Sequence, residues 1–376
     1  MWILAIKAML ADRAKLATSL FGVAFAVVLV NLQGGLLLGL IEKASLLVDY
    51  GQADIWVGRR YTNNVDVGSW IPERWIQRIR KVDGVERAEP YLVSYSEARL
   101  ANGSFEPVIV VGSEPASLLG NAWSMAQGDA RAVRHPDGIL VDSCDAEKLG
   151  HCRVGDTLEI NGRRAKVVGL TDGIVGFSTN PYVFTTLERA RRQYVTGLTP
   201  EYCSFFLVKA RPGTNPRALA ARIQREVPHL DVYDRQTYSR MCMEYWLTRT
   251  GIGMSFGLAT FLGLLVGLAV VGQTLYASVT ERVKEFATLK ALGAADQCVG
   301  QFVLAQALGN AGLGSALGLA ISLAIGWLVN SPRAPINWTW WIGALSVLLT
   351  TGVCLLAAWL PYVRIRRLDP ATVLRG

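Results

Sequence analysis

The sequence lacks the motifs by which many enzymes are recognised. No Gly-x4-Gly-Lys-Ser/Thr loop occurs, and the dipeptide Gly-Lys is missing from the whole chain, so ATP is not expected to bind through a phosphate-cradling loop. His-Glu-x-x-His is also absent, and there are only three histidines, His135, His151 and His229. We therefore predict a non-catalytic protein that needs no cofactor of its own.

Charged side chains are missing from four long stretches of the chain. Each stretch exceeds the roughly 20 residues that a helix needs to cross a bilayer; the stretches are Leu16–Ile41, Thr250–Thr280, Gln297–Pro332 and Ala334–Val363. The chain has 376 residues, of which 51% are hydrophobic. We predict an integral membrane α-helical protein with four transmembrane helices. Because ion-coupled carriers usually need ionisable groups within the membrane, their absence argues against secondary transport.

Cysteine is scarce, and its positions leave two possibilities open. Four of the six cysteines fall in the block of residues 42–249, which has an ordinary charged composition: Cys144, Cys152, Cys203 and Cys242. An even number of cysteines in an oxidising compartment allows disulfides, with three possible connectivities, whereas buried free thiols are the alternative. Cys144, His151 and Cys152 lack an evident fourth ligand, so we predict no metal site.

The basic residues that are present set the orientation in the membrane. Lys and Arg near the ends of the charge-free stretches gather in the N-terminal segment, in residues 281–296 and in the C-terminal tail. Since cytoplasmic loops carry an excess of these residues, both termini and residues 281–296 are predicted to be cytoplasmic, and the block 42–249 extracytoplasmic. The net charge of +8 reflects this topology, because the block has 27 Lys and Arg against 25 Asp and Glu. Nucleic-acid binding is not expected.

The order of these features divides the chain into segments. The first stalk is predicted to be one continuous helix from Leu16 to about Asp49, because the helical pattern persists beyond Ile41. The segments are residues 1–15 as an amphipathic cytoplasmic helix on the membrane lipids, 16–50 as the first transmembrane helix and stalk, 51–235 as the outer domain, 236–280 as a second stalk and transmembrane helix, 281–296 as a cytoplasmic helix, 297–331 and 336–363 as the last two transmembrane helices, and 364–376 as a cytoplasmic tail.

The outer domain alternates short strands and helices, which predicts an α+β fold. Residues 51–115 and 200–235 each have the pattern strand, helix, strand, and they enclose a strand-rich insertion of residues 116–199. Asn161-Gly162 between two alternating segments predicts a hairpin. Residues 142–149 are predicted to form a short helix that ends at Gly150.

Small residues four apart recur in the second and third apolar stretches. Such spacing lets helix backbones approach closely, either within one protomer or across a homodimer. The pairs are Gly253 with Gly257, Gly263 with Gly267, and Gly314 with Gly318.

A charged, capped segment separates those two stretches. Ser278 and Glu281 have the spacing of a capping box, and Gly293 is a natural helix stop. A short charged helix here suits a docking surface for a cytosolic partner, although a solvated turn would carry similar charges. The residues assigned to docking are Glu281, Arg282, Glu285, Phe286, Leu289, Lys290 and Gly293.

Several motifs together resemble one known family. Glu281-Arg-Val-Lys-Glu-Phe-Ala-Thr-Leu-Lys-Ala-Leu-Gly-Ala294 closely resembles the coupling segment of the MacB/FtsX-like permeases, the type VII ABC transporter membrane subunits. Leu368-Asp-Pro-Ala-Thr-Val-Leu-Arg375 resembles the C-terminal signature of that family, and residues 142–172 and 85–90 are similar to its periplasmic domain. The resemblance covers nearly the whole chain and is nearest to stand-alone permeases of the DevC kind, which lack a fused ATPase.

This resemblance implies a subunit of the bacterial inner (cytoplasmic) membrane that works as a homodimer with two copies of a cytosolic ATPase. The ATPase would bind ATP and Mg²⁺ and push on the coupling helix, and the stalks would move the outer domain, which is called mechanotransmission. Substrate would be exported from outside the membrane. By the same analogy the α/β halves are the porter domain and the insertion is a Sabre-like domain. A periplasmic adaptor and an outer-membrane channel commonly complete such an efflux system.

Two alternatives share these features. An FtsX-like subunit would signal to an envelope hydrolase and activate it, and another kind of member would extract lipoproteins or lipids from the outer leaflet. Nothing in the sequence indicates the substrate.

Overall fold

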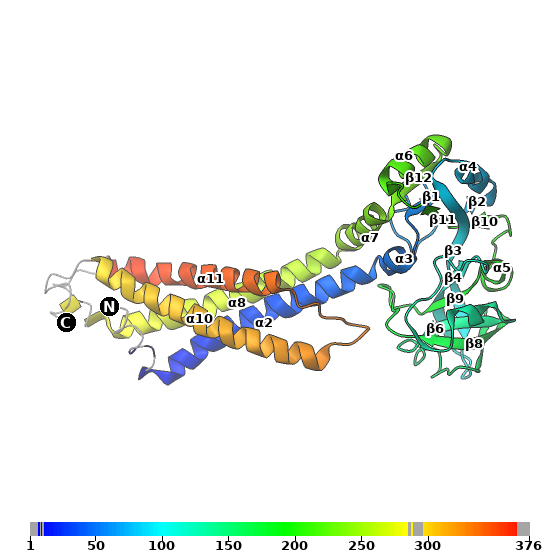
Figure 1. The fold of residues 1–376 in the computed structure, drawn as a ribbon. Coiled ribbons are helices and arrows are strands. Elements are labelled where there is room, and N and C mark those ends of the chain that lie inside the picture. Colours follow the sequence, from blue (N-terminus) through cyan, green and yellow to red (C-terminus); the bar gives the residue numbers. More distant parts are fainter. Residues whose placement is uncertain (1–6, 8, 10, 285–286, 289–295, 367–376) are drawn as a thin grey trace. The chain divides into compact units, whose positions relative to one another are not determined.

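The computed structural model describes residues 7, 9, 11–284, 287–288 and 296–366 (Figure 1). The chain forms two compact units. One consists of residues 1–39 and 253–376, here called the helical bundle, and the other of Leu40–Ile252, here called the sheet domain.

The helical bundle confirms the four predicted membrane helices. Each is long and apolar enough to cross a bilayer. Buried polar side chains join them, since Asn31 donates a hydrogen bond to Ser346 at 2.7 Å and Ser315 bonds Thr350 at 3.2 Å. The helices are α2 (Arg13–Lys43), α8 (Ile252–Glu281), α10 (Asp296–Val329) and α11 (Trp340–Arg366).

Two of the three glycine pairs pack helices together within the protomer. A Cβ atom on Gly263 would lie 2.6 Å from Leu29 of α2, and one on Gly318 of α10 would lie 2.7 Å from Val27 of α2. Gly267 and Gly314 meet α2 in the same way, at Ala26 and Val23. Helix α2 therefore receives α8 and α10 at glycines, and these close approaches belong to the fold of one chain.

The sheet domain is built on ten strands, in the order β12-β1-β11-β3-β4-β9-β6-β8-β5, with β7 beside β3 and β8. A separate pair joins β10 to β2. The strands are β1 (Ile55–Arg59), β2 (Ile71–Pro72), β3 (Val85–Arg99), β4 (Phe105–Ser113), β5 (Met125–Gln127), β6 (Gly138–Asp142), β7 (Thr157–Ile160), β8 (Arg163–Thr171), β9 (Tyr182–Thr186), β10 (Tyr202–Cys203), β11 (Phe205–Ala210) and β12 (Leu230–Asp234).

The two predicted strand–helix–strand segments combine into one half of the sheet domain, in which two helices pack on four strands. Its strands lie in the antiparallel order β12-β1-β11-β3. Helix α4 (Ile76–Arg80), preceded by the 3-10 turn η1 (Glu73–Trp75), joins β1 to β3, and α6 (Pro216–Glu226) joins β11 to β12. This is the ferredoxin-like βαββαβ arrangement. Helix α6 begins at an Asn215 cap that accepts from the backbone N–H of Arg217.

Strand alternation gives the sheet two apolar faces. On one face lie two clusters, one under α4 and α6 and one within the insertion. On the other face, neighbouring residues of the same strands form a third cluster that spans both halves. In β1, for example, Ile55 and Val57 point to the first face and Trp56 to the second. We call the third cluster the central core.

In the sequence, helix α3 (Leu46–Tyr50) comes directly before the first strand of the sheet domain, and helix α7 (Arg235–Arg249) comes directly after the last one. The predicted continuous helix to Asp49 is wrong, because α2 ends at Lys43 and α3 begins only at Leu46. The Ser45 hydroxyl bonds Asp49 at 2.7 Å, and such a side chain competes with helical backbone bonds.

The short helix predicted at residues 142–149 is also wrong. The chain makes consecutive turns there, because the carboxylate of Asp142 holds the backbone N–H groups of Cys144 and Ile174 and the hydroxyl of Thr171. The predicted hairpin is present as β7 and β8, with Asn161 and Gly162 both at positive φ.

Candidate functional site

An ion-pair cluster joins the end of α8 to the beginning of α2. Lys15 pairs with Asp12 at 2.9 Å and with the carboxylate of Glu281, the last residue of α8. Ser278 bonds the Gln306 side chain of α10 at 3.5 Å. The segment that follows Glu281 is thus anchored to two other helices at its origin. Solvent-screened ion pairs of this kind contribute little to stability, so the anchor can be broken at little cost.

Polar side chains continue from this cluster into the bundle. They line a cavity of about 50 Å³ that Ser19, Gln306 and Asn310 share with the ion-pair residues. Within the described chain, Ser19 Oγ and Asn310 Oδ1 are buried without a hydrogen-bond partner. A polar space of this size can hold a few waters.

Only the first predicted docking residues fall within the described structure. Glu281 is exposed at the end of α8, and Arg282 is half-buried in the turn after it. The predicted helix start at Ser278 is wrong, because residues 252–281 form one helix and Ser278 lies inside it. The remaining assigned residues lie outside the described residues: Glu285, Phe286, Leu289, Lys290 and Gly293.

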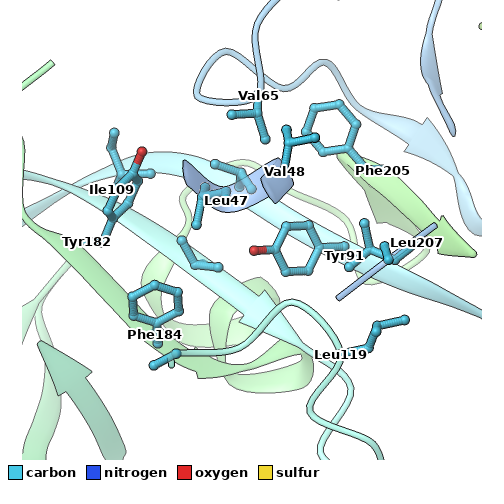
Figure 2. Close-up of a cluster of buried hydrophobic side chains, with 14 of the residues drawn as sticks. Leu47, Val48, Val65, Tyr91, Ile109, Leu119, Tyr182, Phe184, Phe205 and Leu207 are labelled. Carbon is cyan, nitrogen blue, oxygen red and sulfur yellow. The ribbon is translucent and has the colours of Figure 1, made fainter. Parts of the chain in front are cut away.

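The central core brings α3 and α7 onto one face of the sheet. Leu47 and Val48 of α3 are fully buried there among Tyr91, Tyr182 and sheet residues of both halves (Figure 2). From α7 come Tyr238 and Cys242, and the loop after β1 contributes Val65. The chain that leaves the first span and the chain that enters the second therefore both contribute to the core of the sheet domain.

A buried carboxylate lies in this core. Asp66 is 1% exposed, and one of its oxygens accepts a hydrogen bond from the hydroxyl of Tyr182 at 2.6 Å. Its other oxygen has no partner among the residues described. Burial raises the pKa of Asp66 to about 6, against a smaller lowering effect of the Tyr182 hydrogen bond. The only sequence signal for this buried group is an acidic residue between Val65 and Val67, which does not distinguish it from a surface carboxylate.

The structure does not bring the four extramembrane cysteines together. Cys152, Cys203 and Cys242 lie in three different hydrophobic clusters, without a disulfide between them. Burial raises the pKa of the Cys152 thiol to about 11 and that of Cys203 and Cys242 to about 12. Cys144 lies apart, half-buried in the turn after β6. Nowhere in the described chain do three or more His, Cys, Asp or Glu side chains form a metal-binding group.

We expect the three buried thiols to resist alkylation in the folded protein. Iodoacetamide reacts with the thiolate, which burial and a raised pKa both suppress. Mass spectrometry after treatment at pH 8 should find Cys152, Cys203 and Cys242 unmodified, and modified once urea is added. The half-buried Cys144 is the internal reference for reagent access. A thermal midpoint of the sheet domain that falls on addition of dithiothreitol would instead show that disulfides support it.

One large α+β domain inserted after the first of four membrane helices, with both of its connections packed into its core, defines a membrane permease with a large extramembrane domain. Comparison with known proteins assigns the family. Residues 16–226 match the MacB-like periplasmic core domain, and residues 257–370 match the FtsX-like permease C-terminal domain. The chain belongs to the MacB/FtsX-like ABC transporter permeases, and it is a multi-pass membrane protein.

Two curated relatives and two solved domains are similar to the chain. The chain is 24% identical over 349 residues to two uncharacterized ABC transporter permeases of Mycobacterium tuberculosis, strains CDC 1551 / Oshkosh and ATCC 25618 / H37Rv, covering 91% of this chain and 90% of each relative. It is also similar to the periplasmic region of MacB from Actinobacillus actinomycetemcomitans (12% identity, TM-score 0.39, 50% of this chain and 92% of that one). A third likeness is to the extracellular domain of the noncanonic ABC-type transporter YknZ from Gram-positive bacteria (14% identity, TM-score 0.35, 48% and 98%).

Proposed function

We propose that the chain is the membrane subunit of a MacB-like exporter that transmits force from a cytosolic ATPase to its extracytoplasmic sheet domain. The observation that carries this proposal is the central core. Helices α3 and α7 supply Leu47, Val48, Tyr238 and Cys242 to a cluster that also contains both halves of the sheet. A displacement of either helix must therefore be followed by the sheet, because a packed core does not deform continuously.

The partners of this proposal follow from the family. An ABC transporter permease works with an ATPase, and we place two ATPase copies on a homodimer in the bacterial inner membrane, with both termini cytoplasmic. Gly263 and Gly267 of α8 pack against α2, so the face of α8 left for lipid or a second copy carries exposed Met254, Leu258, Phe261, Leu262 and Leu265. A periplasmic adaptor and an outer-membrane channel would receive the substrate.

The test is the association of the permease with its ATPase. Phe286→Ala should weaken co-purification more than Lys290→Ala, because truncating a seated aromatic residue often costs about 2 kcal/mol or more, whereas a rim charge contributes little. Glu285→Arg should weaken it more than Glu285→Gln, since reversal can bring like charges together. Pull-down and ATP turnover of the reconstituted complex measure both effects.

Expression in membranes is the control, since these residues lie outside the spans. Normal ATPase association by Phe286→Ala and Glu285→Arg at wild-type expression would mean that the segment is only a turn between spans. If ATP instead activated a bound envelope hydrolase without export, the signalling alternative would replace transport. Movement of a lipoprotein or lipid out of labelled vesicles would identify lipid extraction.

A further inference from the structure

Strand β3 changes its neighbour partway along one edge. On that edge it pairs with β11 from Val85 to Tyr91 and with β7 only at Ala98 and Arg99. On the opposite edge, β4 accompanies it from Leu92 to Arg99. A gap without a neighbouring strand therefore lies between β11 and β7.

The hydrogen bonds around this gap show which backbone groups it exposes. Ile109, opposite Tyr95 in β4, donates its N–H to Pro181 at 2.9 Å, away from β3. Tyr95 and Ile109 are therefore a non-hydrogen-bonded pair, and the N–H and C=O of Tyr95 point into the gap.

Other side chains and turns close the gap on both sides of Tyr95. The Ser204 hydroxyl accepts from Val93 N–H at 3.1 Å and donates to its C=O at 2.8 Å, and Asn161 N–H donates to Glu97 C=O at 3.0 Å. Across the described chain, no such partner occurs for the backbone of Tyr95. One residue of an open sheet edge thus remains, a template for pairing with another extended chain.

This open position lies in a hollow of about 640 Å³, within the usual volume of ligand pockets. Three exposed aromatic side chains line it: Trp70 at 41% exposure, Tyr95 at 46% and Phe105 at 63%. The wall at Asn161 is preformed, because its side chain bonds Gln193 C=O at 3.2 Å and the Thr196 hydroxyl at 2.8 Å.

Of the two charged side chains that line the hollow, one forms an ion pair and the other forms none among the described residues. Arg99 is engaged by Glu159 of β7 at 3.7 Å. Glu97, two residues away on the same face of β3, forms no ion pair within the described part of the chain. The hollow therefore offers an uncompensated carboxylate beside aromatic rings, which together favour a cation with an apolar neighbour.

We propose that this hollow binds a short, extended, cationic peptide, whose backbone pairs with Tyr95 and whose apolar side chains contact Trp70 and Phe105. As the class of exported substrate, the assignment rests on the proposed function. The backbone supplies affinity through hydrogen bonds, and the alternating side chains supply selectivity.

The test uses the full-length protein in lipid nanodiscs without ATPase and a fluorescein-acylated tetrapeptide Lys-Phe-Lys-Phe, followed by fluorescence anisotropy. Two analogues are N-methylated, one on the lysine amides and the other on the phenylalanine amides. Since alternate amides of a strand face opposite edges, one analogue should bind about tenfold more weakly and the other like the parent. Equal binding of both analogues and the parent would overturn the proposal.

Variants of the chain give an independent reading. Tyr95→Pro removes the open N–H without removing a bond to β4, so it should bind several-fold more weakly than Tyr95→Ala, which loses only the ring. Phe105→Ala and Glu97→Gln should weaken binding, whereas Tyr61→Ala, 85% exposed and outside the hollow, should not. Unchanged affinity in Phe105→Ala and Glu97→Gln would contradict the site.

A separate arm addresses the substrate role. The tetrapeptide should stimulate ATP hydrolysis by the assembled complex, and Tyr95→Pro should abolish the stimulation but not ATPase association. Binding without stimulation would overturn the assignment as substrate and indicate a docking site for a segment of a partner protein. Failure of the proposed function itself would appear in the Phe286→Ala pull-down, which does not involve the hollow.

Discussion

Replacing Trp56 with alanine is expected to lower the free energy of unfolding of the sheet domain by about 3–5 kcal/mol. The indole is 1% exposed in the central core, and its ring centroid lies 5.6 Å from those of Tyr91 and Phe205 and 5.7 Å from that of Tyr238. The indole therefore joins strands β3 and β11 to helix α7. Its removal leaves a cavity that three large rings cannot fill without losing their own contacts.

Thermal unfolding of the intact protein in detergent, followed by near-ultraviolet circular dichroism, measures this loss. For a domain of this size the midpoint should fall by about 10 °C. Trp56→Phe, which keeps a ring in place, should lose less than half as much. Trp70→Ala, at an exposed tryptophan of the same domain, should change the midpoint little. A midpoint for Trp56→Ala equal to that of Trp70→Ala would show that the central core does not hold the domain together.

Replacing Asp66 with asparagine is expected to stabilise the sheet domain at neutral pH. The pKa of Asp66 is about 6 in the folded protein and 3.8 in the unfolded reference. The folded state therefore holds the proton more tightly, so this group favours folding below about pH 4 and loses that contribution as pH rises to about 6. The difference between these two pKa values corresponds to on the order of 2–3 kcal/mol. Asparagine keeps an oxygen for Tyr182 and cannot ionise.

The measurement is the difference in unfolding free energy between Asp66→Asn and the wild type from pH 4 to pH 8. That difference should grow between pH 4 and pH 6 and then remain constant. Tyr182→Phe removes the only described hydrogen-bond donor to the carboxylate, which raises the folded pKa further, so the rise should still begin near pH 4 but extend to higher pH. A difference independent of pH would contradict a raised pKa. Among the described residues, the groups whose pKa the Asp66 carboxylate raises are all acids: Tyr91, Tyr95, Tyr182, Tyr238 and Cys242.

The sequence predicted features that depend on composition or on a few neighbouring residues. Absence of charge over a bilayer length determines a membrane helix, so the four spans were found. The turn Asn161-Gly162 fixes positive φ locally, so the hairpin was found. The same applies to the two strand–helix–strand segments, although nothing in them showed that they pair as one sheet.

Features that depend on contacts between distant residues could not be predicted. The Asp49 carboxylate that bonds Ser45 at the helix break also accepts a hydrogen bond from Ser239 of α7 at 3.1 Å, 190 residues away in the sequence. The carboxylate of Asp66 accepts its hydrogen bond from Tyr182, 116 residues later in the chain. The limits of the outer domain, predicted as residues 51–235, exclude Leu47, Val48, Tyr238 and Cys242 of the central core. The compact unit extends from Leu40 to Ile252 because apolar stalk residues are indistinguishable by pattern from the spans they continue.

Strand β3 also limits which insertions and deletions the protein can tolerate within it. It is a single strand of 15 residues that serves the ferredoxin-like half up to Tyr91 and the insertion from Leu92 onward. Because side chains alternate, one residue added between these halves would turn the apolar set of one half to the wrong face, while two added residues would restore it. Length differences among homologues in this strand should therefore come in pairs, or be accompanied by a bulge that absorbs the odd residue.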